Sequence, residues 1–200
     1  RDLSLIPSPY LTGLMDKFFD DPLVPSTQTN RGCPFDCTFC IEGERYYNKV
    51  AMVGLERSVA EAEYIVRRVK HTKTLRIVDS NFGMFKKDVE FCRYLGELQR
   101  RTGWPDYISC STGKNQKERI LECTQLVGGA IRVSASVQSL VPEVLRNVKR
   151  DNISLEAMMV FSEEAMEANA HVISEIILGL PGDSLQGQEE SMKGLVQAGV

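Results

Sequence analysis

Apolar and polar positions along this chain fall into two repeating patterns, short apolar runs of strand length and longer stretches with apolar residues at helical spacing. The predicted strands cover residues 27–30, 75–79, 107–110, 130–136 and 171–178. The predicted helices cover residues 58–69, 88–102, 116–127, 154–169 and 184–198, and a short one starts at Pro142. Strand and helix therefore alternate along the chain.

Local signals predict where several of these helices begin and end. Ser58 and Glu61 have the spacing of a capping box, and Asp88 and Ser154 are candidate N-caps. Gly103 is expected to end the second helix.

The alternation predicts an α/β protein with a parallel sheet, because strands separated by helices of this length form right-handed βαβ units. Five such units favour a barrel or partial barrel over an open sheet, although periodicity alone does not decide between them. In a parallel barrel the site lies at the carboxyl ends of the strands. The polar stretches at these ends are Asn30 to Cys40, Asp79 to Phe82, Ser111-Thr112, Ser134 to Ser139 and Glu175 to Gly182.

Residues 1–26 lack a strong period and hold four of the eight prolines around a short apolar piece, Leu11 to Phe19. We interpret them as a linker between domains, with residues 27–200 forming one domain. Both ends are expected to be cut from a longer protein, since the chain starts at Arg1 and stops at Val200, where a helix finishes.

Composition excludes some partners. With 42% apolar and 26% charged residues the chain is typical of a globular domain. A net charge of −3 gives no general attraction to nucleic acid or anionic lipid. No apolar run approaches the roughly twenty residues of a membrane span, and no signal peptide is present. We expect a cytoplasmic protein, because free thiols survive in a reducing compartment.

Three of the six cysteines, Cys33, Cys37 and Cys40, have the spacing CxxxCxxC. Iron–sulfur clusters take thiolate ligands, usually four, so three from one loop would leave one iron of a cubane open. Zinc would need a fourth ligand from the two histidines or the scattered cysteines, and a redox dithiol of Cys37 and Cys40 would leave Cys33 without a role. Cys92, Cys110 and Cys123 are better explained as small buried residues.

The motif resembles the cluster-binding loop of radical S-adenosylmethionine (SAM) enzymes, with Phe39 at their aromatic position before the third cysteine. The resemblance implies that a [4Fe–4S] cluster is held by these three cysteines and that SAM chelates the open iron. It also implies a six-unit (β/α) partial barrel, of which residues 27–200 supply five units. The segment Ile6 to Leu14 resembles the connection to an upstream cobalamin-binding domain in one branch of the family, and a plain proline-rich connector is the alternative.

The resemblance also implies which residues hold SAM. The implied contacts are Phe39, Asp79, Ser80, Asn81, Phe82, Ser134, Ser136, Gln138, Glu175, Ile177, Leu178 and Gly179. The stretch from Asp79 departs from the usual glycine- and glutamate-containing motif, so its position carries more of the argument than its side chains. Taken singly, the strand ends also suit ordinary turns. Lys149 and Arg150 suit either the SAM carboxylate or a solvated helix end, and the helix end is favoured.

The function implied is reductive cleavage of SAM to methionine and a 5′-deoxyadenosyl radical that takes hydrogen from a substrate. The electron would come from a donor such as flavodoxin or ferredoxin. Cobalamin bound by another domain would add methyl transfer, and methylthiolation or rearrangement remain open without it. The alternative is an iron–sulfur electron-transfer or binding module that does not cleave SAM.

Overall fold

The computed structural model describes residues 2–200, and Arg1, the first residue of the predicted linker, lies outside them. Five short parallel strands lie side by side in chain order. They are β1 (Ser26–Thr27), β4 (Thr74–Ile77), β5 (Tyr107–Ser109), β6 (Val133–Ser134) and β7 (Val172–Ile173). Strands β1, β4 and β5 form one sheet, β6 pairs with β7, and a parallel bridge between Ile108 and Ile131 joins the two sheets.

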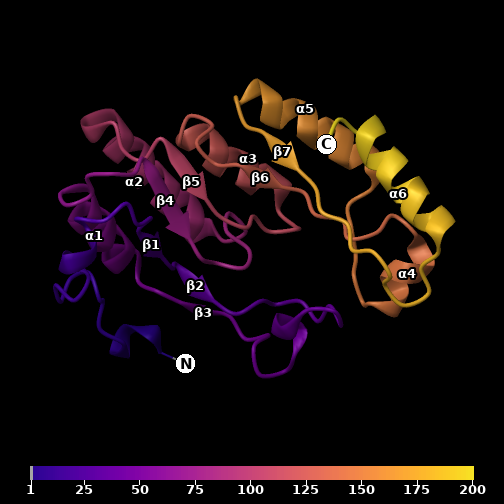
Figure 1. Cartoon of the computed structure of the whole chain (residues 1–200), viewed down its shortest axis with the longest axis horizontal. Coiled ribbons are helices and arrows are strands. Elements are labelled where there is room, and N and C mark those ends of the chain that lie inside the picture. Colours follow the sequence, from indigo (N-terminus) through magenta and orange to yellow (C-terminus); the bar gives the residue numbers. More distant parts are fainter. Residues whose placement is uncertain (1) are drawn as a thin grey trace.

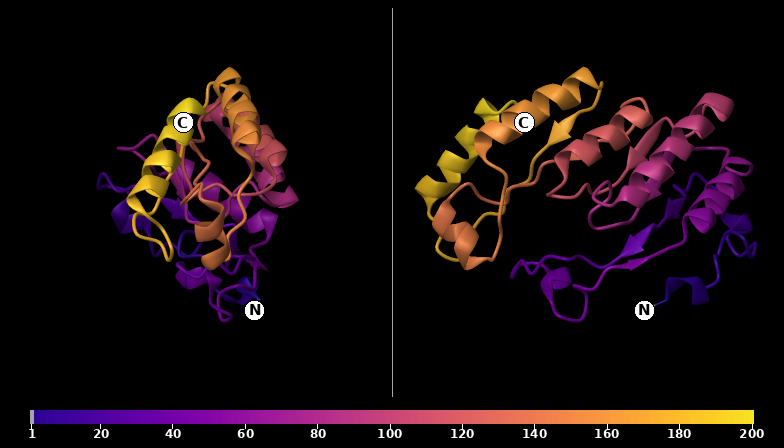
Figure 2. Two further views of the ribbon diagram at one scale, coloured as in Figure 1. Left: turned by 90° about the vertical axis from the view of Figure 1, so that its right-hand side faces the viewer. Right: turned by 180° about the vertical axis from the view of Figure 1, so that it is seen from behind.

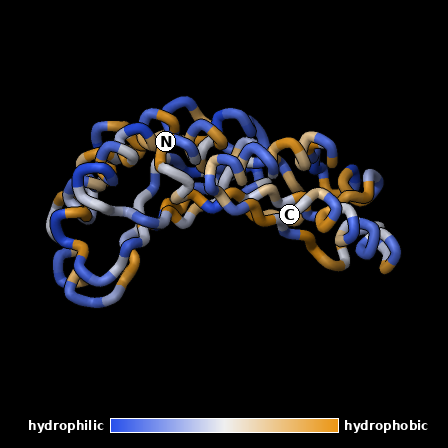
Figure 3. The backbone as a smooth tube through the Cα atoms, turned by 90° about the horizontal axis from the view of Figure 1, so that it is seen from above, coloured by the Kyte–Doolittle hydropathy of each residue, from blue (hydrophilic) through white to orange (hydrophobic). Residues whose placement is uncertain are grey.

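Helices follow the strands along the chain and cover one side of them (Figures 1 and 2). They are α1 (Leu55–Val66), α2 (Lys86–Thr102), α3 (Lys117–Leu126), α4 (Pro142–Asn147), α5 (Leu155–Glu167) and α6 (Leu185–Gln197). Seen from above, the backbone forms an open arch (Figure 3). Strand–helix alternation in this open arch is a partial (β/α) barrel, so the predicted fold class is confirmed. Between residues 2 and 200, no helix is both long enough and apolar enough to cross a membrane.

The core lies between the strands and their covering helices. Leu75 and Ile108 on the strands are fully buried, as are Ile65 of α1 and Leu95 of α2. Burying each such side chain contributes roughly 1.5–3 kcal/mol. The tightly packed core therefore supports the polar residues at the carboxyl ends of the strands.

Two helix starts differ from the prediction. Helix α1 begins at Leu55 rather than Ser58, and the N–H of Ser58 already donates to Gly54 O at 3.2 Å inside the helix. No capping box forms, because the carboxylate of Glu61 accepts from Thr27 Oγ1 and Arg57 Nε, both at 2.9 Å. Helix α2 begins at Lys86. Asp88 is its third residue and accepts from the backbone N–H of Phe85 at 3.0 Å.

Other expected boundaries agree with the structure. Ser154 caps α5 by accepting from the N–H of Ala157 at 3.2 Å. Gly103 follows α2 with a φ of 69°, the left-handed conformation that suits glycine.

The predicted strands are longer than those observed. The fourth and fifth shrink to the two-residue strands β6 and β7, and beyond them Gln138, with a φ of 68°, makes only an isolated bridge to Ile176. The first predicted strand divides into β1 and β2 (Asn30–Arg31). Strand β2 pairs antiparallel with β3 (Ala51–Met52), and this pair closes the loop of residues 32–50, called here the cysteine loop.

The segment before β1 packs against the domain through two short 3₁₀ turns, η1 (Leu3–Leu5) and η2 (Asp16–Phe18). Tyr10 is buried in the main core, and its hydroxyl donates to Ser26 O at 2.8 Å while accepting from Ser26 N at 2.9 Å. Asp16 accepts from the hydroxyl of Tyr64 at 2.6 Å. These contacts fix the segment to α1 and to the start of β1.

Candidate active site

Two glycines shape the cysteine loop. Gly32 has a φ of 99°, and a Cβ there would lie 2.4 Å from the carbonyl oxygen of Lys49. A Cβ on Gly43 would lie 2.3 Å from the carbonyl oxygen of Cys37. Both contacts are with backbone that cannot move aside cheaply, so the loop folds on itself only with glycine at these positions.

Hydrogen bonds close the cysteine loop on itself and tie it to other elements of the barrel. The N–H of Cys33 donates to Tyr47 O at 3.3 Å, and the N–H of Thr38 donates to Val148 O at 3.0 Å. The second bond ties the loop to the residue after α4, on the far side of the barrel mouth. A third element, the loop after β4, reaches the cysteines through Asn81, whose Nδ2 lies 3.2 Å from Cys33 Sγ.

A pocket of about 340 Å³ lies between the cysteine loop and the carboxyl ends of the strands, a size within the range of ligand sites. Its lining includes all three motif cysteines and residues that follow each of the last four strands. The lining residues are Cys33, Phe35, Cys37, Phe39, Cys40, Glu42, Gly43, Ser80, Asn81, Cys110, Ser111, Thr112, Lys114, Ser134, Ser136, Gln138, Arg150, Ile173 and Glu175.

The three motif thiols differ in exposure. Cys37 is buried, Cys33 is half-buried and Cys40 is exposed. In the described part of the chain, no three cysteine, histidine or acidic side chains converge as a ready metal site. The donor set nonetheless fits an iron–sulfur cluster, because three soft thiols on one short loop face one cavity. Ligation of a common cluster requires these side chains to turn toward one another.

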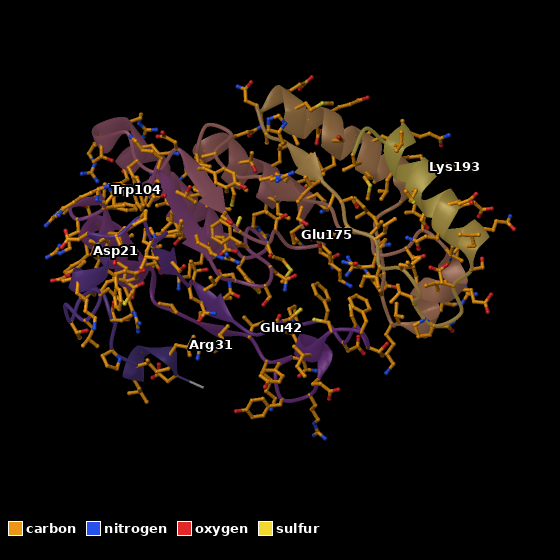
Figure 4. The ribbon with its side chains drawn as sticks, viewed as in Figure 1. Asp21, Arg31, Glu42, Trp104, Glu175 and Lys193 are labelled. Carbon is orange, nitrogen blue, oxygen red and sulfur yellow. The ribbon has the colours of Figure 1, made fainter. Side chains whose placement is uncertain are left out.

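Hydroxyl groups line the wall opposite the cysteine loop. Ser134 Oγ and Ser136 Oγ lie 2.7 Å apart, and Ser136 Oγ donates to Glu175 Oε2 at 2.9 Å. Thr112 fixes this row, since its hydroxyl donates to Ser134 O at 2.9 Å and accepts from Ser134 N at 2.8 Å. Glu175 faces Glu42 of the cysteine loop across the pocket (Figure 4). The wall offers donors and acceptors suited to a polar ligand.

Two buried carboxylates lie beneath the start of the cysteine loop. Asp79 Oδ1 accepts from the N–H groups of Thr29 at 2.8 Å and Asn30 at 3.3 Å, and Asp79 Oδ2 accepts from Asn30 Nδ2 at 2.8 Å and from the Thr29 hydroxyl. Asp88 Oδ2 accepts from Gly83 N at 2.9 Å. The network ties the ends of β1 and β4 to the start of α2.

Burial raises the pKa of Asp79 to about 6, although its hydrogen bonds with Thr29 and Asn30 oppose the shift. Burial also raises the pKa of Asp88. The Thr29 hydroxyl reaches both carboxyl groups but has one hydrogen to donate. A proton on one of the two carboxyls therefore suits this geometry.

Cations from two elements, the β5–α3 connection and the segment after α4, line the pocket or lie near it. Lys114 Nζ lies 4.0 Å from the ring centroid of Phe35 on the cysteine loop. Arg150 lines the same pocket and donates from Nε to Asn152 Oδ1 at 2.9 Å. Lys117 is the first residue of α3, and burial, with a smaller effect of the Arg150 charge, lowers its pKa to about 8.

Ten of the predicted cofactor and metal residues meet at this pocket, and five do not line it. Asp79 points into the buried network, and Phe82 is fully buried in the core. Ile177 packs with Phe39 on a small cluster beside α4, while Leu178 is 78% exposed and Gly179 begins a turn with a φ of 78°. Their predicted SAM contacts stay predictions.

Several residues of the lining had no predicted role, or a different one. Lys114 and Glu42 lie on loops without a strong pattern, and Cys110 was expected to be inert core. Arg150 was assigned to a solvated helix end, but it turns into the pocket and donates to Ser136 O. Arg150 comes shortly after the short helix α4, and this position was the one sequence feature that could have indicated a place at the barrel mouth.

An open parallel barrel with a three-cysteine loop over its mouth is the arrangement of a cofactor-dependent enzyme. Comparison with known proteins identifies the family. The sequence profile of the Radical SAM superfamily matches residues 27–194. The chain therefore belongs to the Radical SAM superfamily, and the resemblance inferred from the motif is confirmed.

Curated relatives match nearly the whole chain. It is 31% identical to the 2-(S-pantetheinyl)-carbapenam-3-carboxylate methyltransferase of Streptantibioticus cattleyicolor and 29% identical to the cobalamin-dependent radical SAM methyltransferase TokK of Streptomyces tokunonensis. Each match covers 96% of this chain and 29% of the relative. The chain thus spans under a third of the length of these relatives.

Solved structures share the fold. The radical SAM methyltransferase TsrM from Kitasatospora setae, with tryptophan substrate and a SAM analogue, superposes with a TM-score of 0.72 at 15% identity over 91% of this chain and 35% of that one. The cobalamin-dependent SAM radical enzyme OxsB gives 0.65 at 17% identity over 94% of this chain and 28% of that one.

Proposed function

We propose that this chain is the catalytic core of a radical SAM enzyme that binds a [4Fe–4S] cluster through Cys33, Cys37 and Cys40 and binds SAM in the adjoining pocket. The observation that carries the proposal is that all three thiols line one cavity together with the polar carboxyl ends of the barrel strands. Membership of the superfamily supports it. An electron-transfer module without SAM cleavage would not need that polar wall.

When bound, the reduced cluster supplies one electron that cleaves a carbon–sulfur bond of SAM, giving methionine and a 5′-deoxyadenosyl radical. The residues of this chain bind SAM and orient it. Ser134, Ser136 and Gln138 offer hydrogen bonds to ribose or carboxylate oxygens. Phe39, which packs against the same small apolar cluster as Ile177, would supply an apolar surface for the adenine. The pocket also limits the access of water to reactive atoms.

We infer that Asn81 positions Cys33. Its side-chain N–H donates toward the Cys33 sulfur at 3.2 Å, and hydrogen bonds to cluster sulfurs help to set the reduction potential. An external electron donor such as flavodoxin or ferredoxin would supply the electron. A reducing, cytoplasmic setting stays a prediction.

The proposed activity is tested by product analysis of anaerobically prepared protein given SAM and a strong reductant. We expect 5′-deoxyadenosine and methionine in equal amounts, and we expect Cys40→Ala to abolish both. Cys123→Ala is the matched control, because this thiol is buried in the core away from the pocket. Cluster-loaded protein that binds no SAM would support the electron-transfer alternative instead.

We further propose that the full-length protein binds cobalamin in a domain outside this chain and transfers a methyl group. Two of its relatives are named as cobalamin-dependent enzymes. Residues 1–26 would then be the connection between that domain and the radical SAM domain of residues 27–200. Because Tyr10 and Asp16 are fixed to the domain, the connection would hold the two cofactors in register.

Cobalt content of full-length protein produced in cobalamin-replete medium tests this second proposal. We expect one corrinoid per chain and transfer of the labelled methyl group of SAM to a product. Well-folded, iron-loaded protein without cobalt would exclude cobalamin and leave the radical SAM assignment in place.

A further inference from the structure

One wall of the pocket carries positive charge that the chain does not neutralise. Lys114 and Arg150 line this wall, and Lys117 at the start of α3 lies near enough for the charge of Arg150 to affect it. Among residues 2–200, none of the three has a carboxylate within ion-pair distance. Buried or half-buried cations are usually paired, so an unpaired group at a cavity calls for an explanation.

Lys114 is held where its ammonium group faces the cavity. It follows β5, and its Nζ lies against the ring of Phe35, 4.0 Å from the centroid. This cation–π contact restrains the long side chain without using its N–H donors. In the described structure these donors make no hydrogen bond with protein, and they remain free for a ligand.

Arg150 comes from a different element, the segment after α4, and is restrained by hydrogen bonds. Its Nε donates to Asn152 Oδ1 at 2.9 Å, and its Nη2 donates to Ser136 O. Within residues 2–200, Nη1 has no hydrogen-bond acceptor. The guanidinium plane is therefore fixed in place with part of its donor edge open.

Lys117 adds charge at a cost to folding. Its Nζ has one weak contact, 3.5 Å from Gly113 O, and lies 4.8 Å from the centroid of the Phe161 ring. Burial and the charge of Arg150 both disfavour its ammonium form and lower its pKa. An anionic ligand in the pocket would offset this cost, because no carboxylate among residues 2–200 forms an ion pair with Lys117.

We propose that this wall, with Lys114 as its contact residue, binds an anionic oxygen group of the substrate, either a carboxylate or a phosphate. The inference rests on the proposed function, because it assigns part of the same pocket to the second reactant. SAM carries a sulfonium, an amino group and one carboxylate; the amino and carboxylate groups would chelate the open iron of the cluster, and Glu42 and Glu175 on the lining offer negative charge for the sulfonium. The basic wall is left for a different molecule.

Calorimetric titration at low ionic strength measures the affinity of the pocket for two probes. Inorganic pyrophosphate represents a phosphate group, and succinate represents a carboxylate. We expect measurable binding of at least one probe and a loss of about tenfold in affinity in Lys114→Gln, as for removal of a charge-assisted contact. Lys193→Gln is the control, because Lys193 is exposed on α6 and paired with Glu189 at 3.6 Å, away from the pocket (Figure 4). Its affinity should match the wild type.

A parallel titration of cluster-loaded protein with labelled SAM separates the two possible anions. We expect Lys114→Gln to weaken probe binding more than SAM binding. An equal or larger loss of SAM affinity would mean that the wall holds the SAM carboxylate, and would overturn the proposal. So would a wild type that binds neither probe, or a Lys193→Gln loss as large as that of Lys114→Gln. A wild type that binds the probe but takes up neither cluster nor SAM would refute the proposed function and leave the anion wall supported.

Discussion

Two groups of ionisable side chains flank the same barrel mouth, and they differ in whether the protein supplies partners for them. Beneath the cysteine loop, Asp79 and Asp88 are buried and accept hydrogen bonds from Thr29, Asn30 and other groups. By contrast, the cations Lys114, Lys117 and Arg150 have no acidic partner among residues 2–200.

The difference separates a structural role from a binding role. A buried polar group that is fully hydrogen-bonded specifies one arrangement of the backbone, here the start of the cysteine loop. A half-buried charge without a partner costs folding free energy, and proteins keep such groups where a ligand completes them. The carboxylates should therefore matter most for stability, and the cations most for binding.

The largest expected effect is on stability, from Asp79→Ala. The substitution leaves the N–H groups of Thr29 and Asn30 and the Asn30 side-chain amide without their acceptor, and buried donors left unpaired cost about 1–3 kcal/mol each before relaxation. We expect a loss of roughly 4 kcal/mol in urea unfolding. Asp79→Asn keeps one oxygen acceptor for the two backbone donors, and its loss should be less than half as large.

The same carboxylate should make stability depend on pH. The folded-state pKa of Asp79 is raised from 3.8 to about 6, so its contribution is fully present below pH 3.8 and is lost as the pH rises through about 6. The expected change is about 3 kcal/mol in the free energy of unfolding, from 1.36 kcal/mol per pKa unit. Urea titrations between pH 4 and 7 measure it, and the difference between wild type and Asp79→Asn isolates it. A pH-independent difference would show that Asp79 is ionised throughout this range.

The cation side predicts a change of opposite sign, because Lys117→Met should stabilise the protein at pH 7. The pKa of Lys117 is lowered from 10.5 to about 8, so its contribution to stability is present above pH 10.5 and lost as the pH falls through about 8. Removing this charge should raise the free energy of unfolding by about 2 kcal/mol, less than the full shift implies because the packing also changes. Lys193→Met is the control and should change stability little. A destabilised Lys117→Met would mean that the ammonium is paired in solution.

Sequence reasoning found the fold and the cysteine loop because both depend on local pattern. Alternating apolar periods determine the order of strands and helices, and CxxxCxxC places three thiols on one loop whatever its conformation. The structure then explains the glycines at positions 32 and 43, because the loop closes on its own carbonyl groups there and leaves no room for a Cβ.

The direction of individual side chains at the strand ends could not be predicted. Ser80 and Asn81 lie in a bend after β4 and both line the pocket, whereas Asp79 just before them points beneath the loop, so no regular alternation gives their directions. The predicted starts of two helices were wrong for a related reason. Glu61 and Asp88 have the local spacing of caps, but Glu61 bonds Thr27, which is distant in sequence, and Asp88 bonds Gly83 and Thr29 as well as the helix start. For Arg150 the helix-end reading was favoured over a ligand contact, because only the tertiary fold returns this residue to the mouth.

The central claim is that Cys33, Cys37 and Cys40 together hold one cluster, and iron analysis with Mössbauer spectroscopy on single alanine variants tests it most directly. Cys110→Ala is the sharpest control, because this half-buried thiol lines the same pocket but burial raises its pKa and keeps it protonated. The account predicts one [4Fe–4S] cluster per chain in the wild type and in Cys110→Ala, and its loss in each of the three motif variants. A cluster that survives in a motif variant, or that requires Cys110, would contradict the assignment.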